Sequence, residues 1–257
     1  ACISIAAVIT ICLFMFANGV PAIKEIGITK FLFGTQWRVS QNLFGIWPMI
    51  VGSIYVTAGA MIIGVPIGLL TAVFLAKYCP KKLYKFIKPI INLMAGIPSI
   101  IYGFFGLVIL VPFVRDTFGG RGMSVLTASI LLGLMILPTI ISMSEASIRA
   151  VPQSYYEGGL ALGASHERSV FFTVVPAAKS GIFASVVLGV GRAIGETMAV
   201  MMVAGNQTVI PEKITDGVRT LTTNIVMEMG YSTDLHREAL IATAVVLFVF
   251  ILIINLS

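Results

Sequence analysis

Long apolar runs alternate with short polar connections along the whole chain. A helix needs about 20 apolar residues to cross a bilayer, and six segments have that length and hydropathy to within a few residues. They are residues 2–18, 48–76, 87–114, 124–144, 175–205 and 239–256. The pattern predicts an all-α integral membrane protein with six transmembrane helices in a single domain, residues 1–257. Because the first run starts at Ala1 without a positively charged segment, we expect a trimmed N-terminus rather than a signal peptide.

The composition supports a membrane protein and excludes a soluble globular one. The chain is 58% hydrophobic and 11% charged, with a mean hydropathy of +1.00, which lies outside the range of soluble domains. The net charge of +6 does not indicate a nucleic-acid partner, because the basic residues cluster at the ends of the apolar runs.

Three prolines lie inside predicted spans: Pro66, Pro98 and Pro138. Proline removes a backbone donor and clashes with the carbonyl four residues earlier, so we expect kinks in three helices. The freed carbonyls need partners in neighbouring helices or in a water-filled cavity.

The lysines between the second and third spans predict the orientation. Five lysines and no acid lie between residues 77 and 88, and the positive-inside rule places such a connection in the cytoplasm. Counting spans from there places residues 145–174 and both termini in the cytoplasm as well. Residues 19–47, 115–123 and 206–238 then face outward.

The connection at residues 151–178, VPQSYYEGGLALGASHERSVFFTVVPAA, has the signals of two short helices rather than of a flexible linker. Pro152 suits a first helical turn, Gly163 suits a left-handed C-terminal stop, and Ser165 can cap a second helix. We expect Pro176 to open the next span.

This connection resembles the shared motif of the membrane subunits of bacterial ATP-binding-cassette (ABC) importers. That motif begins with Glu-Ala-Ala, continues after three residues with Gly, and ends nine residues later with a hydrophobic residue, one further residue and Leu-Pro. The matching positions here are Glu157, Gly158, Gly159, Gly163, Thr173, Val175 and Pro176. The spacing fits throughout, while Gly for Ala twice, Thr for the hydrophobic residue and Val for Leu are departures.

The resemblance implies that the first short helix docks on a separate ATP-hydrolysing subunit and transmits its closure to the spans. The small residues Gly158, Gly159 and Ala161 permit close backbone approach, and Glu157 can pair with a basic group. A helix pair lying on the membrane surface is the alternative. Since the chain has no GxxxxGK[ST] phosphate loop, ATP and Mg²⁺ would be used by the partner, and we expect no cofactor on this chain.

Two opposite charges interrupt the fifth span, in the stretch GRAIGETMAV: Arg192 and Glu196. Intramembrane charges usually face protein or water and mark a pathway. At positions i and i+4 of one helix the two side chains could pair, and Gly191 and Gly195 would let another helix approach closely. An architectural ion pair is the alternative to an anion pathway.

The stretch GVGRAIGETMAVMMVAGN closely resembles the matching helix of phosphate importer permeases, in particular the PstC type. Further stretches support this resemblance: FGIWPMIVGSIYVTAG, MAGIPSIIYGFFGLVILVP and GLMILPTIISMSEASIRAVP. Sulfate and molybdate permeases usually continue the Gly-Glu pair with an aromatic residue and glycine, whereas Thr197 and Met198 follow it here. The resemblance implies a phosphate pathway past Arg192 and Glu196.

The same resemblance implies the partners and the location. They are a sibling permease of the PstA type, a pair of ATPase subunits and a phosphate-binding protein outside the bacterial cytoplasmic membrane. A permease for a sulfate- or molybdate-type oxyanion, an ATP-independent secondary carrier and an intramembrane enzyme are the alternatives. We identify no catalytic group and no metal-ligand spacing, and we expect His166 and His236 to be solvated.

Overall fold

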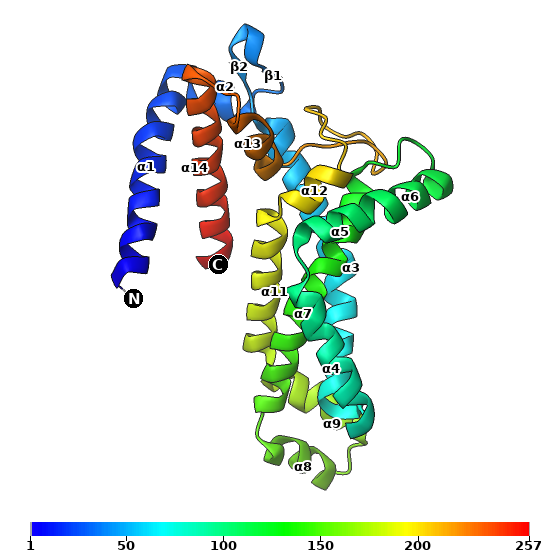
Figure 1. The fold of residues 1–257 in the computed structure, drawn as a ribbon. Coiled ribbons are helices and arrows are strands. Elements are labelled where there is room, and N and C mark those ends of the chain that lie inside the picture. The colour runs from blue at the N-terminus through cyan, green and yellow to red at the C-terminus, as the bar shows by residue number, and fades with distance from the viewer. Residues whose placement is uncertain (1, 257) are drawn as a thin grey trace.

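The computed structural model describes residues 2–256 and is mostly helical (Figure 1). Ala1 and Ser257 lie outside the described residues. The α-helices are α1 (Cys2–Ile26), α2 (Ile28–Phe33), α3 (Trp47–Val73), α4 (Lys81–Gly96), α5 (Ser99–Phe105), α6 (Val111–Phe118), α7 (Val125–Ala150), α8 (Gln153–Ala161), α9 (His166–Ser169), α10 (Val175–Ala177), α11 (Lys179–Gly195), α12 (Met198–Val203), α13 (Leu221–Met229) and α14 (Asp234–Leu256).

Shorter elements interrupt or join these helices. The π-helical turns are Phe74–Tyr78, Gly106–Leu110 and Val170–Val174. The strands β1 (Trp37–Arg38) and β2 (Leu43–Phe44) form an antiparallel hairpin around the 3₁₀ turn Val39–Gln41. The all-α prediction is therefore confirmed apart from this small hairpin.

Within residues 2–256 there are five candidate membrane spans, or the six that the sequence predicts if one bent pair of helices is counted as a single span. Five are long, apolar and unbroken by a sharp bend: Ile3–Ile26, Trp47–Tyr78, Ser99–Phe118, Val125–Ala150 and Asp234–Leu256. A sixth results when His166–Ala177 and Lys179–Gly195, which meet at an angle of 68°, are counted together.

The predicted third span, residues 87–114, is wrong as one helix. α4 ends at Gly96, and Ile97 and Pro98 are extended, with ψ angles of 126° and 139°. Proline disfavours a helical conformation in the residue before it, so the helix stops there and α5 starts at Ser99. By contrast, α3 and α7 continue through Pro66 and Pro138.

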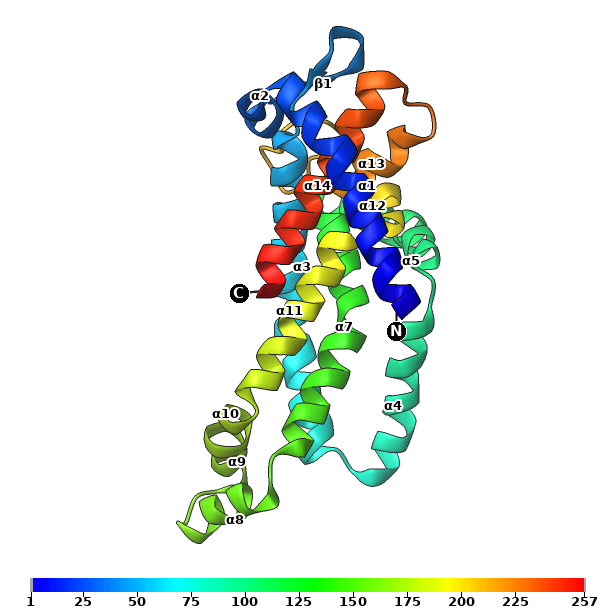
Figure 2. The same cartoon turned by 90° about the vertical axis from the view of Figure 1, so that its left-hand side faces the viewer.

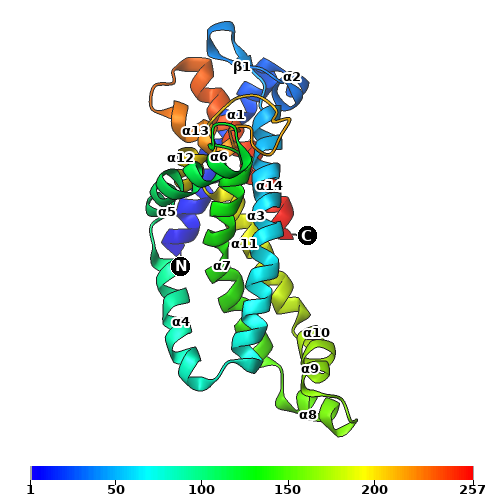
Figure 3. The ribbon, with the colours of Figure 1, turned by 90° about the vertical axis from the view of Figure 1, so that its right-hand side faces the viewer.

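α3 and α7 pack side by side along the centre of the molecule (Figures 1 and 3). The apolar stretch of α7 is 67% buried inside the chain, a larger share than for the spans formed by α1, α3 or α14. Gly64 and Gly68 of α3 lie against the side chains of Ile136 and Ile140. A Cβ on either glycine would contact them at 2.8 Å, so both glycines are needed for this close approach.

α1 and α14 form a pair that stands to one side of the central helices (Figure 1). Phe16 and Phe248 meet edge to face, with ring centroids 6.1 Å apart. In α1 only 6% of the apolar window is buried within the chain. Because so large an apolar surface is not stable in water, α1 must face lipid or another subunit.

The two ends of the molecule differ in structure (Figure 2). One end, here called the hairpin end, holds the β-hairpin, α2, α12, α13 and the loop between α12 and α13. The opposite end, here called the α8 end, holds α8, α9 and the beginning of α4 (Figures 1 and 3).

Candidate functional site

Arg192 lies in the last turn of α11 and is exposed in the single chain. Its Nη1 donates a hydrogen bond to Oγ1 of Thr139 on α7, at 3.1 Å. Thr139 follows Pro138, which is buried in the core. One bond uses one of the five N–H donors of a guanidinium, so most of the fork stays available to a ligand.

Glu196 does not continue the helix of Arg192. α11 ends at Gly195, and Glu196 has an extended backbone with a ψ angle of 129°. Its Oε1 accepts hydrogen bonds from the backbone N–H groups of Thr197 and Ala199, at 3.1 and 3.2 Å. The carboxylate therefore caps α12, and its negative charge is favourable at a helix N-terminus.

The predicted pairing of Arg192 with Glu196 is wrong. It assumed one unbroken helix, in which positions i and i+4 share a face, but the break turns the two side chains to different partners. The Oγ1 of Thr222, on α13, donates to the backbone carbonyl of Glu196 at 3.1 Å. This contact holds the extended residue in place between the two helices.

The glycines beside Arg192 do not carry a close helix contact within the described residues. A Cβ on Gly195 would meet nothing within 4 Å, and one on Gly191 would reach only Oδ1 of Asn255, at 3.7 Å. The predicted close approach is therefore absent here. α11 meets α7 closely at two other glycines, Gly181 against Ser147 and Gly189 against Ile140.

The predicted two-helix connection at residues 151–178 is confirmed. Gly163 has a φ of +83° and ends the first helix in the left-handed conformation, and Ser165 Oγ accepts a bond from the N–H of Arg168, at 3.3 Å. Pro176, however, lies exposed inside α10, and the straight part of the span starts only at Lys179.

The small residues of α8 have different surroundings. A Cβ on Gly159 would lie 2.7 Å from the Oγ of Ser169, so this glycine allows α8 to pack on α9. A Cβ on Gly158 would meet nothing within 4 Å. Glu157 and Ala161 are exposed, and so is Leu162, at 91% of its surface. The structure thus leaves one face of α8 unpartnered.

Sequence reasoning missed a buried ionic cluster around Glu145, which is only 2% exposed. Its two oxygens accept bonds from Lys88 Nζ at 2.7 Å and from Arg149 Nε at 2.8 Å. Arg149 also donates from Nη2 to the carbonyl of Leu75, at 2.7 Å. The cluster joins α4, α7 and the π-helical turn after α3. The i, i+4 spacing of Glu145 and Arg149 was the available signal.

A second buried network, at the hairpin end, was also missed. Glu228 on α13 accepts bonds from Trp37 Nε1 at 2.8 Å and from Arg219 Nη1 at 2.6 Å. His236 Nε2 lies 2.9 Å from its Oε2. Burial alone would raise the pKa of Glu228, but these hydrogen bonds outweigh it and hold the pKa below its ordinary value.

The two histidines are less exposed than predicted. His236 is 8% exposed and stacks on Phe44, with ring centroids 6.0 Å apart, so the prediction of a solvated side chain is wrong. His166 is half-buried, and its Nδ1 lies 2.7 Å from the hydroxyl oxygen of Tyr156.

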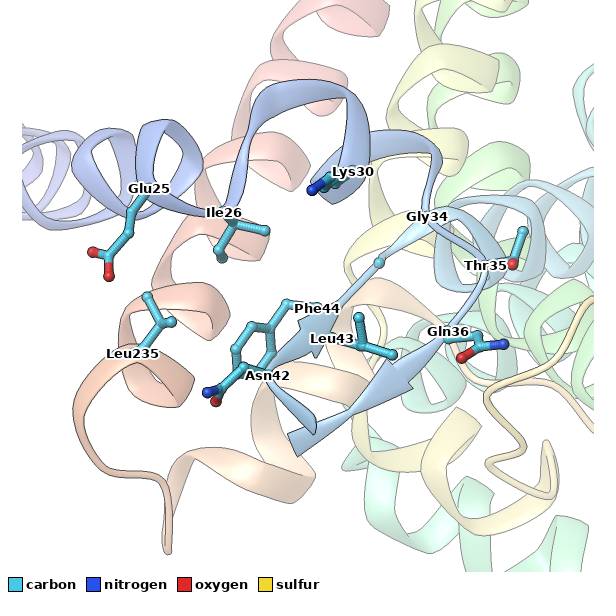
Figure 4. A pocket seen from close by; sticks show the side chains of 11 residues that line it. Glu25, Ile26, Lys30, Gly34, Thr35, Gln36, Asn42, Leu43, Phe44 and Leu235 are labelled. Carbon is cyan, nitrogen blue, oxygen red and sulfur yellow. The ribbon is translucent and has the colours of Figure 1, made fainter. Parts of the chain in front are cut away.

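A hollow of about 470 Å³ opens at the hairpin end, away from Arg192 and Glu196. Figure 4 shows Glu25 and Ile26 on one side, Leu235 across from them, Lys30 on α2 and Phe44 on β2. The hollow has both polar and apolar lining residues.

Comparison with known proteins identifies the family. Residues 64–257 match the family described as "Binding-protein-dependent transport system inner membrane component". The chain belongs to this family. It is therefore a transport subunit of an ABC system, not an enzyme.

Several relatives match over nearly the whole chain. A probable ABC transporter permease, YqgH of Bacillus subtilis, is 38% identical over 99% of this chain and 86% of its own length. The phosphate transport system permease PstC of Xylella fastidiosa strain Temecula1 is 34% identical over 95% of this chain and 81% of its own length. A probable phosphate transport system permease PstC of Methanocaldococcus jannaschii is 31% identical over 95% of this chain and 84% of its own length.

Solved structures show the same fold at low sequence identity. A chain of a bacterial alginate ABC transporter, crystallised with its alginate pentasaccharide-bound periplasmic protein, has a TM-score of 0.66 at 16% identity, covering 99% of this chain and 90% of its own. A chain of the inward-facing methionine ABC transporter MetNI has a TM-score of 0.64 at 23% identity, and the match covers 82% of this chain and 93% of that one.

Proposed function

We propose that this chain forms half of the translocation pathway of an ABC importer for inorganic phosphate, as a PstC-type permease. The observation that carries the proposal is the set of PstC relatives, 31–34% identical over 93–95% of the chain. The exposed guanidinium of Arg192 supports it, because parallel N–H donors suit a tetrahedral oxyanion.

In this proposal Arg192 contacts the passing anion and Glu196 limits how long it stays. The bond to Thr139 directs the guanidinium while most of its donors remain free. Glu196 follows directly after the end of α11, and its negative charge opposes tight anion binding. Because the carboxylate also caps α12, it keeps the break beside Arg192 open.

The coupling loop, about residues 151–178, would connect this pathway to ATP hydrolysis. Glu157, Gly158 and Ala161 would form the docking side of α8. Gly159 would hold α8 against α9, Gly163 would form the corner after α8, and Pro176 lies in the helix behind it. The open space around Gly158 supports a partner backbone there. A pair of ATPase subunits would bind ATP and Mg²⁺, and no residue of this chain is assigned to either.

The whole chain would act as one transmembrane domain in the bacterial cytoplasmic membrane, with the α8 end and both termini in the cytoplasm. The lysines of the α3–α4 connection support this orientation. A PstA-like sibling permease would complete the pathway, and a phosphate-binding protein would dock at the hairpin end.

Transport by the reconstituted complex tests the proposal. With its neighbouring subunits in vesicles, the complex should take up labelled phosphate, and excess phosphate should compete while sulfate and molybdate should not. Arg192→Gln should reduce uptake about tenfold or more, as expected for a lost charge-assisted contact. Glu196→Gln should change the dependence of uptake on phosphate concentration.

The exposed Lys82→Gln provides a control, because it also removes one positive charge but lies at the start of α4, away from the helix break and from the hairpin end where the binding protein would dock. Unchanged uptake in both pathway variants would reduce Arg192 and Glu196 to an architectural role. Equal competition by sulfate would contradict the phosphate assignment.

A further inference from the structure

A hollow at the α8 end is lined by groups that bind anions. Its volume is about 440 Å³, and its lining residues are Ala76, Lys77, Arg149, Gln153, Tyr156 and His166. They come from the π-helical turn after α3, the end of α7, α8 and the first residue of α9. The hollow therefore lies where two spans meet the coupling loop, far from the helix break at Glu196 (Figure 1).

The cations of the hollow are not neutralised by its own lining. Lys77 forms no ion pair among the described residues, and its Nζ lies 5.9 Å from the centre of the Tyr156 ring. Arg149 is bound through Nε and Nη2 to Glu145 and Leu75, which leaves the Nη1 donors. No carboxylate is among the lining residues, and the one on Glu145 is already shared by Lys88 and Arg149.

Neutral donors in the hollow are held in place by their neighbours. The Tyr156 hydroxyl and His166 Nδ1 are 2.7 Å apart, and the Tyr78 ring packs edge-on against His166 at 4.8 Å between centroids. The bond occupies Nδ1 of His166 and leaves Nε2 for another partner. Gln153 adds an amide. Glu157 and Glu167, the acids of α8 and α9, are exposed and lie outside the lining.

We propose that this hollow binds a phosphoryl oxyanion, supplied by an anionic lipid headgroup or by free phosphate. A lysine point charge, an arginine fork and neutral donors together suit the phosphoryl group, and basic pockets between spans at the membrane surface bind lipid headgroups. A bound anion would contact the π-helical turn after α3, the end of α7 and α8 at once. It would therefore restrain the coupling loop relative to the spans, whatever substrate the pathway carries.

Chemical labelling of lysines tests the site in the complete transporter complex. The complex is placed in nanodiscs of phosphatidylcholine alone and acetylated, and each lysine is quantified by peptide mass spectrometry. One arm adds inorganic phosphate against sodium chloride of equal ionic strength, and the other adds phosphatidylglycerol to the lipid. Lys82 is the internal control, because it lies in the same connection, is exposed and is not a lining residue.

Lys77 should be protected in at least one arm while Lys82 labelling stays constant. Protection by phosphate alone would identify free phosphate as the ligand, and protection by phosphatidylglycerol alone would identify the lipid headgroup. Protection in both arms would show that the site accepts either one. If Lys77 is protected no more than Lys82 in both arms, the proposal is overturned.

Variants distinguish a formed site from diffuse attraction. His166→Phe keeps a ring against Tyr78 and Tyr156 but deletes the nitrogens, and it should raise the half-protecting concentration of the effective anion about tenfold. Arg168→Gln, on the same helix, removes an exposed cation outside the lining and should leave that concentration unchanged. Equal weakening by both variants would overturn the proposal.

Discussion

Single ionisable residues inside the spans are retained here by specific partners. Glu145 shows this most clearly, since it is 2% exposed and accepts from Lys88 and Arg149. Replacing a buried ion pair by apolar groups is often neutral, whereas removing one partner leaves an uncompensated charge and is costly. Replacing Lys88 in α4 or Arg149 in α7 by an uncharged residue would therefore leave the buried charge of Glu145 with only one ionic partner.

Glu145→Gln should destabilise the protein by about 2 kcal/mol, less than for a fully buried pair because Lys88 and Arg149 are partly exposed. The midpoint of thermal unfolding of the detergent-purified protein should fall accordingly. Glu238→Gln, an exposed acid at the start of α14, is the control and should leave the midpoint unchanged. An equal midpoint for both variants would contradict the role given to the cluster.

At the scale of elements, the coupling loop is formed by signals a few residues apart. Gly163 supplies the left-handed stop and Ser165 the next cap, so the corner between α8 and α9 is fixed by the local sequence. Of the two glycines inside α8, Gly159 packs against Ser169 of α9, whereas Gly158 faces open space. A substitution at Gly158 can therefore test docking of the loop without disturbing its fold.

Gly158→Ala should leave the thermal stability of the isolated permease unchanged or slightly raised, because alanine favours a helix by about 1 kcal/mol and the added Cβ has open space. The same change should weaken co-purification of the ATPase subunits, since the docked partner would fill that space. Full recovery of the ATPase with Gly158→Ala would show that this face of α8 is not the docking surface.

Gly163→Ala is the matched variant for the fold of the loop. Its φ of +83° disfavours any residue with a Cβ, at a cost of about 1 kcal/mol. It should therefore lower stability as well as co-purification, unlike Gly158→Ala.

At the scale of the whole molecule, one carboxylate holds together the hairpin end. Glu228 connects β1 through Trp37, the α12–α13 loop through Arg219, and α14 through His236. Segments separated by up to 191 residues along the chain meet there. The hairpin end is consequently a single connected body rather than a set of independent loops.

Lowering the pH should destabilise the hairpin end by protonating Glu228. The pKa of Glu228 is lowered in the folded state, so its stabilisation is fully present above the ordinary carboxyl pKa and is lost as the pH falls below about 4. Emission from Trp37, recorded in a Trp47→Phe background, should change over that range. In Glu228→Gln the acid-induced change should disappear; its persistence would assign the transition to another group.

The sequence predicts those features whose interacting residues lie close together along the chain, and it fails where the partners are far apart along it. The spans follow from apolar runs and the loop from Gly163 and Ser165, all local signals. The break at Glu196 lies inside an apolar run of helical composition, and its support comes from Thr222, 26 residues later. Likewise Glu145 and Lys88 are 57 residues apart, so neither partner identifies the other in the sequence.

α11 is a straight helix between two breaks in the backbone. The lower joint is the bend of 68° before Lys179, and the upper joint is the break after Gly195. The 17 residues of α11 span about 25 Å, so a tilt of about 10° at the lower joint carries the upper end through about 4 Å. Arg192 sits beside the upper joint. A small displacement of the loop can thus move the guanidinium by about 4 Å without breaking a backbone hydrogen bond inside α11.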